Sequence, residues 1–408
     1  MSSAFAAAMP PRGEPTVRVM VVDDAVVVRG LMARWLGEAG GIEVVASHRN
    51  GRAAVEDMER ADPDVVVLDI EMPEMDGMAA LPEILKKKRN VIVIMASTLT
   101  RRNAEISLKC LSLGATDYVP KPESNAAVTT SPEFRREIVE KVKALGRRAL
   151  SLHGASSPGR SEPMTRAELA TRSPASPAGF RASAPASAAG GGFLAKERAA
   201  QSGGDFRLRP FPNTVPRVLV IGASTGGPQA LNTVVAGIAK MIDRVPVLIV
   251  QHMPATFTTI LAEHLARASG KPCAEAVDGE PIRPGRIYVA PGGRHMLVKR
   301  GDGHGVIALD DGPMVNFCKP AVDPMFASAA SVFGAAAFGL VLTGMGSDGA
   351  NGARDLVAAG GGVIAQDEAT SVVWGMPGAT AQAGHCSAVL PLAEIAPKLV
   401  RFFAGDRT

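Results

Sequence analysis

A long stretch of small residues and proline divides this chain into two parts that have to fold separately. Between Ala149 and Pro212, Ala, Ser, Pro and Gly occupy 38 of the 64 positions. Such a composition buries too little apolar surface to offset the entropy of ordering the chain, so it is typical of a flexible linker. The expected division is a disordered tail, a first domain, a flexible linker and a second domain: residues 1–15, 16–146, 147–213 and 214–408.

The same stretch accounts for the net charge of the whole chain. It holds seven Arg and one Lys against four acids, a balance of +4, and the chain as a whole is also +4. The rest of the sequence is therefore near neutral and contains few aromatic residues, which disfavours nucleic-acid binding.

The scattered cysteines are typical of reduced thiols in a cytoplasmic protein. No apolar stretch reaches the roughly 20 residues of a membrane span, and Met1–Pro15 lacks the apolar core of a signal peptide.

Both folded parts alternate short apolar strands with helical segments, which predicts mostly parallel sheets with helices on both faces. In such doubly wound folds, sites form at the carboxyl ends of the strands. Strands of the first domain are expected at Val17–Val22, Val65–Leu68, Val91–Ala96 and Asp117–Val119. Strands of the second are expected at Val218–Ile221, Val245–Val250, Ile287–Ala290, Gly339–Leu342 and Gly362–Ala365. Its helices are expected at Gln229–Met241, Thr256–Ala268, Pro324–Phe333, Ala350–Ala359 and Leu392–Phe403, and Leu208–Pro212 is expected to dock on it.

Three carboxylates follow two strands of the first domain. Asp23 and Asp24 come directly after the first expected strand, and Asp69 comes after the second. Parallel strands bring these groups to one sheet edge, where clustered carboxylates repel one another and invite Mg²⁺. Ser97-Thr98 and Lys121 follow the next two strands, and such hydroxyl and ammonium groups bind phosphoryl oxygens. A single Asp here is most simply a solvated charge, but the whole set predicts phosphoryl transfer.

These residues resemble the response-regulator receiver family over about residues 16–145. The resemblance implies a flavodoxin-like fold in which a histidine kinase of the chemotaxis pathway phosphorylates Asp69, with Mg²⁺ held by Asp23, Asp24 and Asp69. It also implies that Ser97 and Tyr118 move when Asp69 is modified, and that Lys121 binds the phosphoryl group. The motifs that carry it are Val22–Asp24, Leu68–Gly77, Ser97-Thr98 and Lys121-Pro122.

A glycine-rich run, Gly222–Gly227, contains a serine at an expected strand-to-helix turn in the second domain. There the hydroxyl of Ser224 would lie beside backbone N–H groups of a helix N-terminus, which favour negative charge. Taken alone, the run is weak evidence for catalysis, because a simple glycine-rich connection or a phosphate cradle is the more common explanation of such a sequence. It matches neither Gly-x-Gly-x-x-Gly nor the P-loop pattern, so the common nucleotide fingerprints are absent.

Two further polar residues directly follow expected strands of the second domain. His252 and Asp348 stand in the same relation to their strands as Ser224 does to its own. One edge of the sheet would then carry a nucleophile, a base and an acid that orients the base. A lone histidine after a strand is more often a polar cap. His295 also follows a strand, so it is a rival base that could line the same pocket.

This half resembles the catalytic domain of the chemotaxis receptor methylesterase family, CheB. The resemblance covers about residues 215–404, and the receiver before it extends the match to the whole architecture. Its segment Asn316–Pro320 is less basic than in the family. The motifs that carry the resemblance are Gly222–Pro228, Gln251–Pro254, Ala290–Met296, Leu342–Gly349 and Trp374–Pro377.

The CheB resemblance implies a Rossmann-like domain that needs no metal and works through a serine triad. Ser224 would be the nucleophile, His252 the base and then the acid, and Asp348 the residue that orients His252. The backbone N–H groups of Thr225 and Met345 would donate to the oxyanion.

The implied reaction is hydrolysis of glutamate γ-methyl esters on the cytoplasmic domains of methyl-accepting chemotaxis receptors, with deamidation of receptor glutamines by the same steps. The protein would act in the cytoplasm as a monomer, without inserting into the membrane. Phosphorylation of Asp69 would move the receiver away from Ser224.

One alternative function keeps the hydrolase but gives it a receptor-like substrate in another pathway. Another is a phosphorylation-dependent binding protein with the hydrolase domain as a scaffold, and an output that binds DNA is disfavoured because no basic recognition helix follows the receiver.

Overall fold

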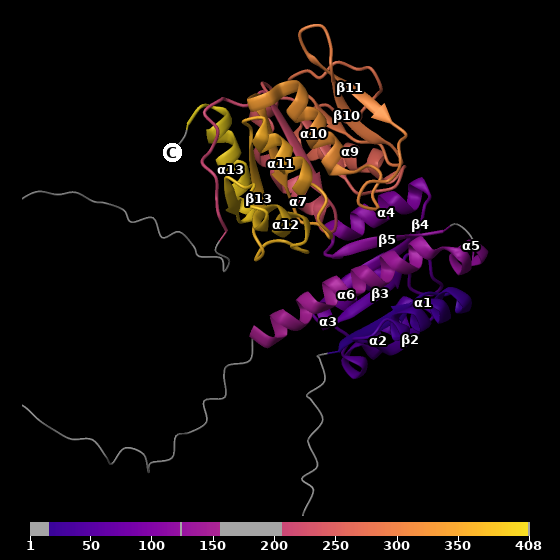
Figure 1. The fold of residues 1–408 in the computed structure, drawn as a ribbon. Coiled ribbons are helices and arrows are strands. Elements are labelled where there is room, and N and C mark those ends of the chain that lie inside the picture. The colour runs from indigo at the N-terminus through magenta and orange to yellow at the C-terminus, as the bar shows by residue number, and fades with distance from the viewer. Residues whose placement is uncertain (1–15, 123–124, 156–205, 407–408) are drawn as a thin grey trace, which may run out of the picture.

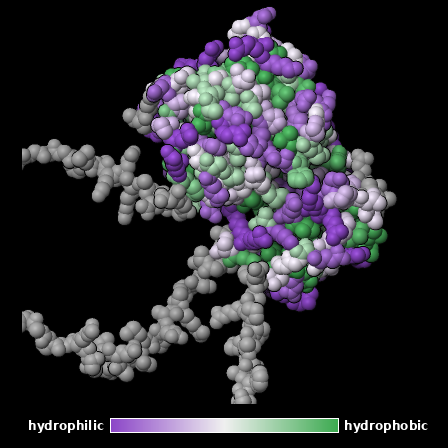
Figure 2. Space-filling model, in the orientation of Figure 1, coloured by the Kyte–Doolittle hydropathy of each residue, from purple (hydrophilic) through white to green (hydrophobic). Residues whose placement is uncertain are grey.

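The computed structural model describes residues 16–122, 125–155 and 206–406. These residues form two α/β domains that pack against each other (Figure 1). The expected tail, residues 1–15, and most of the expected linker lie outside the described residues. Hydrophilic and hydrophobic side chains are interspersed over the visible face of both domains (Figure 2). Within the described part of the chain, no helix is both long and apolar enough to cross a membrane.

The first domain is built on a five-stranded parallel sheet in the order β2-β1-β3-β4-β5. This order is flavodoxin-like and changes direction between β1 and β3, where such folds place their sites. The strands are β1 Val17–Val22, β2 Ile42–His48, β3 Val65–Asp69, β4 Ile92–Thr98 and β5 Asp117–Lys121. The helices are α1 Val26–Glu38, α2 Gly51–Ala61, α3 Gly77–Lys87, α4 Arg101–Ser112, α5 Asn125–Thr130 and α6 Pro132–Ala155.

Alternating side chains of the central strands fill two separate cores, because successive residues of a strand point to opposite faces. Val19 and Val21 of β1 join the core beneath α1 and α6. Met20 and Val22 join the core beneath α2, α3 and α4. Burial on both faces explains why the strands read as continuous apolar runs rather than alternating patterns.

The second domain contains a seven-stranded parallel sheet in the order β14-β13-β12-β6-β7-β9-β8, with an antiparallel hairpin beside it. The sheet strands are β6 Val218–Ala223, β7 Val247–Gln251, β8 Cys273–Glu275, β9 Ile287–Val289, β12 Ala337–Val341, β13 Gly362–Gln366 and β14 Ala388–Leu390. The hairpin strands are β10 His295–Arg300 and β11 Gly305–Asp310. The helical segments are α7 Gly227–Gly237, α8 Ala239–Ile242, α9 Phe257–Ser269, α10 Val322–Phe333, η1 Gly334–Ala336, α11 Ala350–Ala358, α12 Met376–Gln382 and α13 Leu392–Phe403.

Helices cover both faces of this sheet, as the strand–helix rhythm predicts. Leu219 and Ile221 of β6 pack with α7, α9 and α13 on one face. Val218 and Val220 pack with α10 and the hairpin on the other. The doubly wound, parallel-sheet fold expected for both domains is thus confirmed.

Described structure extends into the expected linker, residues 147–213, from both ends. Helix α6 continues past residue 146 to Ala155, because buried Leu145 and Ala149 extend its apolar face against the core of the first domain. At the other end, docking of Leu208–Pro212 is confirmed. The ring of Phe211 lies 5.0 Å from that of Phe402, and the backbone N–H of Arg209 donates to the carbonyl of Cys386 at 2.9 Å.

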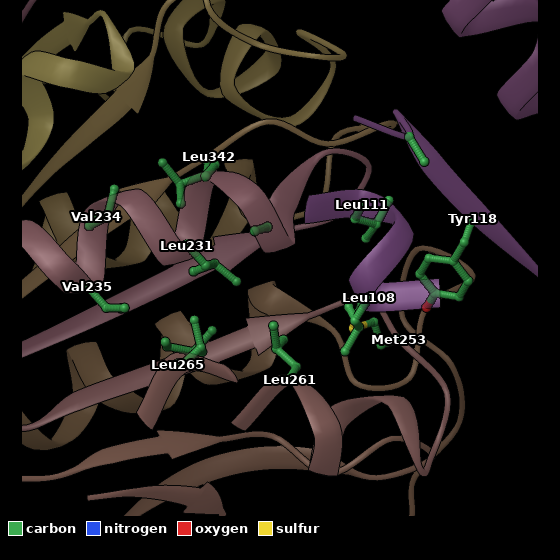
Figure 3. Close-up of a cluster of buried hydrophobic side chains, with 14 of the residues drawn as sticks. Leu108, Leu111, Tyr118, Leu231, Val234, Val235, Met253, Leu261, Leu265 and Leu342 are labelled. Carbon is green, nitrogen blue, oxygen red and sulfur yellow. The ribbon is translucent and has the colours of Figure 1, made fainter. Parts of the chain in front are cut away.

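The two domains meet where α4 and β5 of the first approach α7 and α9 of the second (Figure 1). Tyr118 of β5 stacks on Phe257 of α9, with ring centroids 4.6 Å apart and planes 8° from parallel. Leu108 and Leu111 of α4 lie in the same buried cluster as Leu231, Leu261 and Met253 of the second domain (Figure 3). The interface is therefore an apolar core shared by both domains, and polar contacts flank it. The guanidinium of Arg101 donates to Glu263 at 2.8 Å, and the amide of Gln229 donates to the carbonyl of Ala115 at 3.1 Å.

Candidate functional sites

The carboxylates predicted to cluster in the first domain do so in the structure. Because β1 and β3 are neighbours in the sheet, the loop after β1 and the end of β3 bring Asp23, Asp24 and Asp69 together. Their nearest carboxylate oxygens all lie within 4.8 Å of one another. The ammonium of Lys121, at the end of β5, lies 2.6 Å from Asp69 Oδ1 and 3.0 Å from Asp23 Oδ2.

Burial makes this cluster costly to ionise. It raises the pKa of Asp69 to about 6, although Lys121 works against that change. Burial also raises the pKa of Asp23. Three oxygen ligands around one point suit a hard divalent cation, whose positive charge would favour the ionised carboxylates. The donor set therefore fits Mg²⁺, and the structure places Lys121 where it can also contact a group attached to Asp69.

The two hydroxyls at the end of β4 have different neighbours. Ser97 is buried, and its hydroxyl lies 2.8 Å from that of Ser107 on α4. Thr98 faces the pocket beside Asp69, and its hydroxyl accepts a hydrogen bond of 2.7 Å from Asn103. This difference follows from strand alternation. A movement of Ser97 on modification stays a prediction, and Asn103 is a pocket residue that the sequence did not reveal.

In the second domain, the strand that carries the serine lies between the strands that carry the histidine and the aspartate. The order β12-β6-β7 is also the point at which the sheet changes direction, the usual location of a site in such folds. The backbone N–H of Ser224 donates to the carbonyl of Thr343 beyond β12 at 3.0 Å. The backbone N–H of His252 donates to the carbonyl of Ala223 at 3.1 Å. Backbone pairing thus brings all three loops to one edge.

The carboxylate of Asp348 is almost fully buried, and both of its oxygens accept hydrogen bonds. His252 Nε2 lies 2.8 Å from its Oδ2, the amide of Asn316 donates to its Oδ1 at 3.0 Å, and the backbone N–H groups of Val322 and Asp323 donate at 2.6 and 3.1 Å. The last two belong to the N-terminal turn of α10, which favours negative charge. Burial alone would raise the pKa of Asp348, but the hydrogen bond and charge of His252, together with the two backbone donors, hold it below its usual value.

His252 uses one ring nitrogen for Asp348 and presents the other to the neighbouring loop. Its Nδ1 lies 3.4 Å from the sulfur of Cys318. Burial disfavours the charged imidazole, but the hydrogen bonds to Asp348 and Cys318 outweigh that effect and raise the pKa of His252 to about 10. Since Nε2 is held by Asp348, any exchange of a proton with a serine hydroxyl would have to use Nδ1.

Glycines fix the shape of the loops around Ser224. Gly226 has φ +74°, which glycine adopts readily, and it forms the N-cap of α7. A Cβ on Gly344 would lie 2.9 Å from Ser224 Cβ and 2.3 Å from the sulfur of Met376, so only glycine fits there.

Among the described residues, no hydrogen bond uses the backbone N–H of Thr225 or Met345. The expected oxyanion donors are therefore unengaged.

The structure places His295 away from solvent, with both ring nitrogens occupied. Its Nε2 lies 2.9 Å from the carbonyl of Pro313, and its Nδ1 accepts from the backbone N–H of Ala321 at 3.2 Å. These contacts join β10 to the loop that contains Cys318. They favour His252 over His295 as the base, and contact of His295 with substrate stays a prediction.

Comparisons with known proteins match both domains to protein families. Residues 219–399 match the CheB methylesterase family, and residues 19–131 match the response regulator receiver domain. A protein-glutamate methylesterase/protein-glutamine glutaminase of Nitrobacter hamburgensis is 58% identical over 97% of this chain and 96% of that protein. A relative of the same name, from the group 2 operon of Bradyrhizobium diazoefficiens, is 57% identical over 96% of this chain and 95% of its own.

This chain belongs to the CheB family.

Among solved structures, the crystal structure of the Thermotoga maritima CheB methylesterase catalytic domain is 39% identical and covers 46% of this chain and 99% of its own, with a TM-score of 0.45. The crystal structure of the T. maritima CheB response regulator domain is 34% identical and covers 33% of this chain and 97% of its own, with a TM-score of 0.29.

Sequence reasoning missed the residues that hold the loops of the candidate site in place in this CheB-family chain. The amide of Gln251 donates to the carbonyl of Ser224 at 2.8 Å, and the hydroxyl of Thr343 donates to the carbonyl of Thr225 at 2.8 Å. Asp323 accepts from Asn316 at 2.9 Å and from the backbone N–H of Gly349 at 2.9 Å. A polar residue directly after an apolar strand was a usable signal for Gln251 and Thr343, whereas Asn316 depends on a long loop with no such signal.

Proposed function

We propose that this protein hydrolyses γ-methyl esters of glutamate on the cytoplasmic domains of methyl-accepting chemotaxis receptors. The observation that carries the proposal is the His252–Asp348 pair, 2.8 Å apart, in the loops that follow the two strands on either side of the strand before Ser224. A base oriented by a buried carboxylate next to a serine at a strand-to-helix turn is the arrangement of a serine hydrolase. The curated relatives are named for this activity.

In the proposed reaction, Ser224 Oγ attacks the ester carbonyl and His252 Nδ1 takes its proton. The negative charge on the carbonyl oxygen is stabilised by the backbone N–H groups of Thr225 and Met345. His252 then returns the proton to the leaving oxygen, and methanol departs. Water attacks the acyl-enzyme by the same steps and releases the receptor glutamate. A receptor glutamine would follow the same route with ammonia as the leaving group, and no metal takes part in this domain.

The receiver domain is proposed to regulate this reaction through Asp69. Asp69 would accept phosphate from a histidine kinase, with Asp23 and Asp24 completing a Mg²⁺ site and Lys121 contacting the phosphoryl oxygens. Mg²⁺ would neutralise charge on the phosphoryl group during transfer. The protein would act in the cytoplasm and as a monomer.

The domain interface supports a closed state in which the receiver restricts the catalytic site. Met253 is the neighbour of His252 in the chain, and it packs in the cluster that Leu108 and Tyr118 supply from the receiver (Figure 3). Val373 packs against the other receiver core, and its carbonyl accepts from the backbone N–H of Gly344, which lies against Ser224. Phosphorylation would shift the population toward an open state that admits the receptor.

The proposed function is tested with the full-length protein and receptor membranes that carry radiolabelled methyl esters. We expect release of volatile methanol together with receptor glutamate. The matched control is the same membrane preparation with the label in lipid methyl groups rather than in receptor esters, which should release nothing. Receptor that keeps all of its label after incubation with phosphorylated protein would contradict the proposed activity.

A further inference from the structure

One contact at the catalytic centre has no role in the proposed reaction. The thiol of Cys318 lies 3.4 Å from His252 Nδ1, the nitrogen that must serve Ser224. Nε2 of the same ring is held by Asp348 at 2.8 Å. Both ring nitrogens are therefore occupied, and among the described residues no hydrogen bond joins His252 to the hydroxyl of Ser224.

Cys318 belongs to a turn that contacts both members of the His–Asp pair. The backbone N–H of Cys318 donates to the carbonyl of Val315 at 2.9 Å, and the reverse bond measures 3.1 Å. Between them, Asn316 and Phe317 have φ of 52° and 61°, so both central residues are left-handed, as in a type I′ turn. The side-chain amide of Asn316 donates to Asp348, and the thiol of Cys318, the last residue of the turn, contacts His252.

The tip of this turn reaches the receiver. The guanidinium of Arg136, on α6, lies over the ring of Phe317 at 4.9 Å from its centre. The ring is otherwise exposed, so the contact of this side chain with the receiver exists only while the domains are packed together. The position of the turn, and with it the position of Cys318, is thereby linked to the closed arrangement.

We propose that Cys318 is a positioning residue that holds His252 Nδ1 in the closed arrangement and keeps it from Ser224. The inference rests on the proposed function, because it assigns Nδ1 as the base. In the closed protein the thiol and the serine hydroxyl compete for one nitrogen. Separation of the domains removes Arg136 from Phe317, frees the turn and lets Nδ1 reach the serine.

The proposal makes a prediction about proton affinity, because the sulfur contact favours the charged imidazole. Loss of that contact lowers the pKa of His252, so the imidazole becomes neutral, and able to act as a base, at lower pH. The charged groups near this pair are Asp348, which contacts the ring, Asp323, whose backbone N–H donates to Asp348, Lys319, next to Cys318 in the chain, and Arg136 from the receiver. A substitution at Cys318 leaves all four in place.

The test measures the titration of His252 by NMR of the imidazole nitrogens in the unphosphorylated full-length protein. In Cys318→Ala, His252 should titrate roughly one pH unit below its value in wild type. In Cys318→Ser, whose hydroxyl oxygen can still accept from protonated Nδ1, it should titrate between the two. Cys273→Ala is the matched control: it removes a half-buried thiol on β8 and should titrate with wild type. Superimposable titrations of Cys318→Ala and wild type would overturn the proposal.

Activity provides a second reading of the same variants. Below the midpoint of the titration, methanol release by unphosphorylated Cys318→Ala should exceed wild type about tenfold, and a phosphodonor should reduce that difference. A variant that is equally slow at every pH would show a packing role instead and overturn the proposal. The NMR titration needs no substrate, so an inactive wild type would count against the proposed function and leave the titration to decide the role of Cys318.

Discussion

Replacing Ser224 by alanine is expected to reduce methanol release from methylated receptors by about 10⁴-fold or more. The variant keeps the His252–Asp348 pair and the backbone donors, but it has no atom that can form the acyl-enzyme. Members of a triad act as a unit, so the loss of the nucleophile removes nearly the whole effect of the other two. The measurement is the initial rate of methanol release by the phosphorylated full-length protein.

Ser331→Ala provides the matched control for this substitution. Ser331 is an exposed residue of α10, and its removal changes the same atoms at a position outside the site. Its rate should equal that of wild type, and all three proteins should unfold at closely similar temperatures. Methanol release by Ser224→Ala at the wild-type rate would show that another group is the nucleophile.

Replacing Tyr118 by alanine is expected to raise the activity of the unphosphorylated protein about tenfold or more. Tyr118 is buried and stacks on Phe257 across the domain interface. An aromatic pair contributes about 0.5–1.5 kcal/mol beyond the burial of its surface. Each 1.4 kcal/mol lost by the closed state changes the ratio of open to closed protein about tenfold. The rate of methanol release without phosphodonor reports this ratio.

Tyr118→Phe is the control that keeps the ring and removes only the hydroxyl. It should preserve the stack on Phe257 and therefore the low basal rate. Both variants should retain a folded receiver, which the thermal unfolding of the full-length protein would report. Equal basal rates for Tyr118→Ala and wild type would show that this interface does not restrain the catalytic site.

The residues at the two sites were predictable from sequence because they directly follow apolar strands. Asp69, Ser224 and His252 each come at or just after the end of a parallel strand, and the carboxyl ends of such strands share one edge. Strands buried on both faces have an unmistakable apolar pattern. The sequence therefore predicts that these residues lie at the shared edge without any knowledge of the strand order.

Other elements escaped prediction because their sequences are not apolar throughout. Strand β2 contains Glu43, Ser47 and His48 and lies at the edge of the receiver sheet. Hairpin strand β10 ends in Lys299-Arg300, which face solvent. Such half-exposed strands lack a continuous apolar run, so neither was expected.

Contacts that depend on long-range packing could not be predicted at all. The thiol of Cys318 reaches His252 across 66 positions of the chain. The stack of Tyr118 on Phe257 joins two domains, and nothing near either residue in the sequence indicates the partner. The sequence predicted candidates for the residues that carry out the chemistry, whereas the structure was needed to find what holds them and what links the two domains.

The central claim is that phosphorylation of Asp69 controls ester hydrolysis at Ser224. The most direct test measures methanol release from methylated receptors by the full-length protein, with and without an acetyl-phosphate-type donor and Mg²⁺. In wild type, donor and Mg²⁺ together should increase the rate, and removal of Mg²⁺ by a chelator should abolish the increase. Asp69→Asn should show the basal rate under every condition. A donor-dependent increase of the same size in Asp69→Asn would contradict the account.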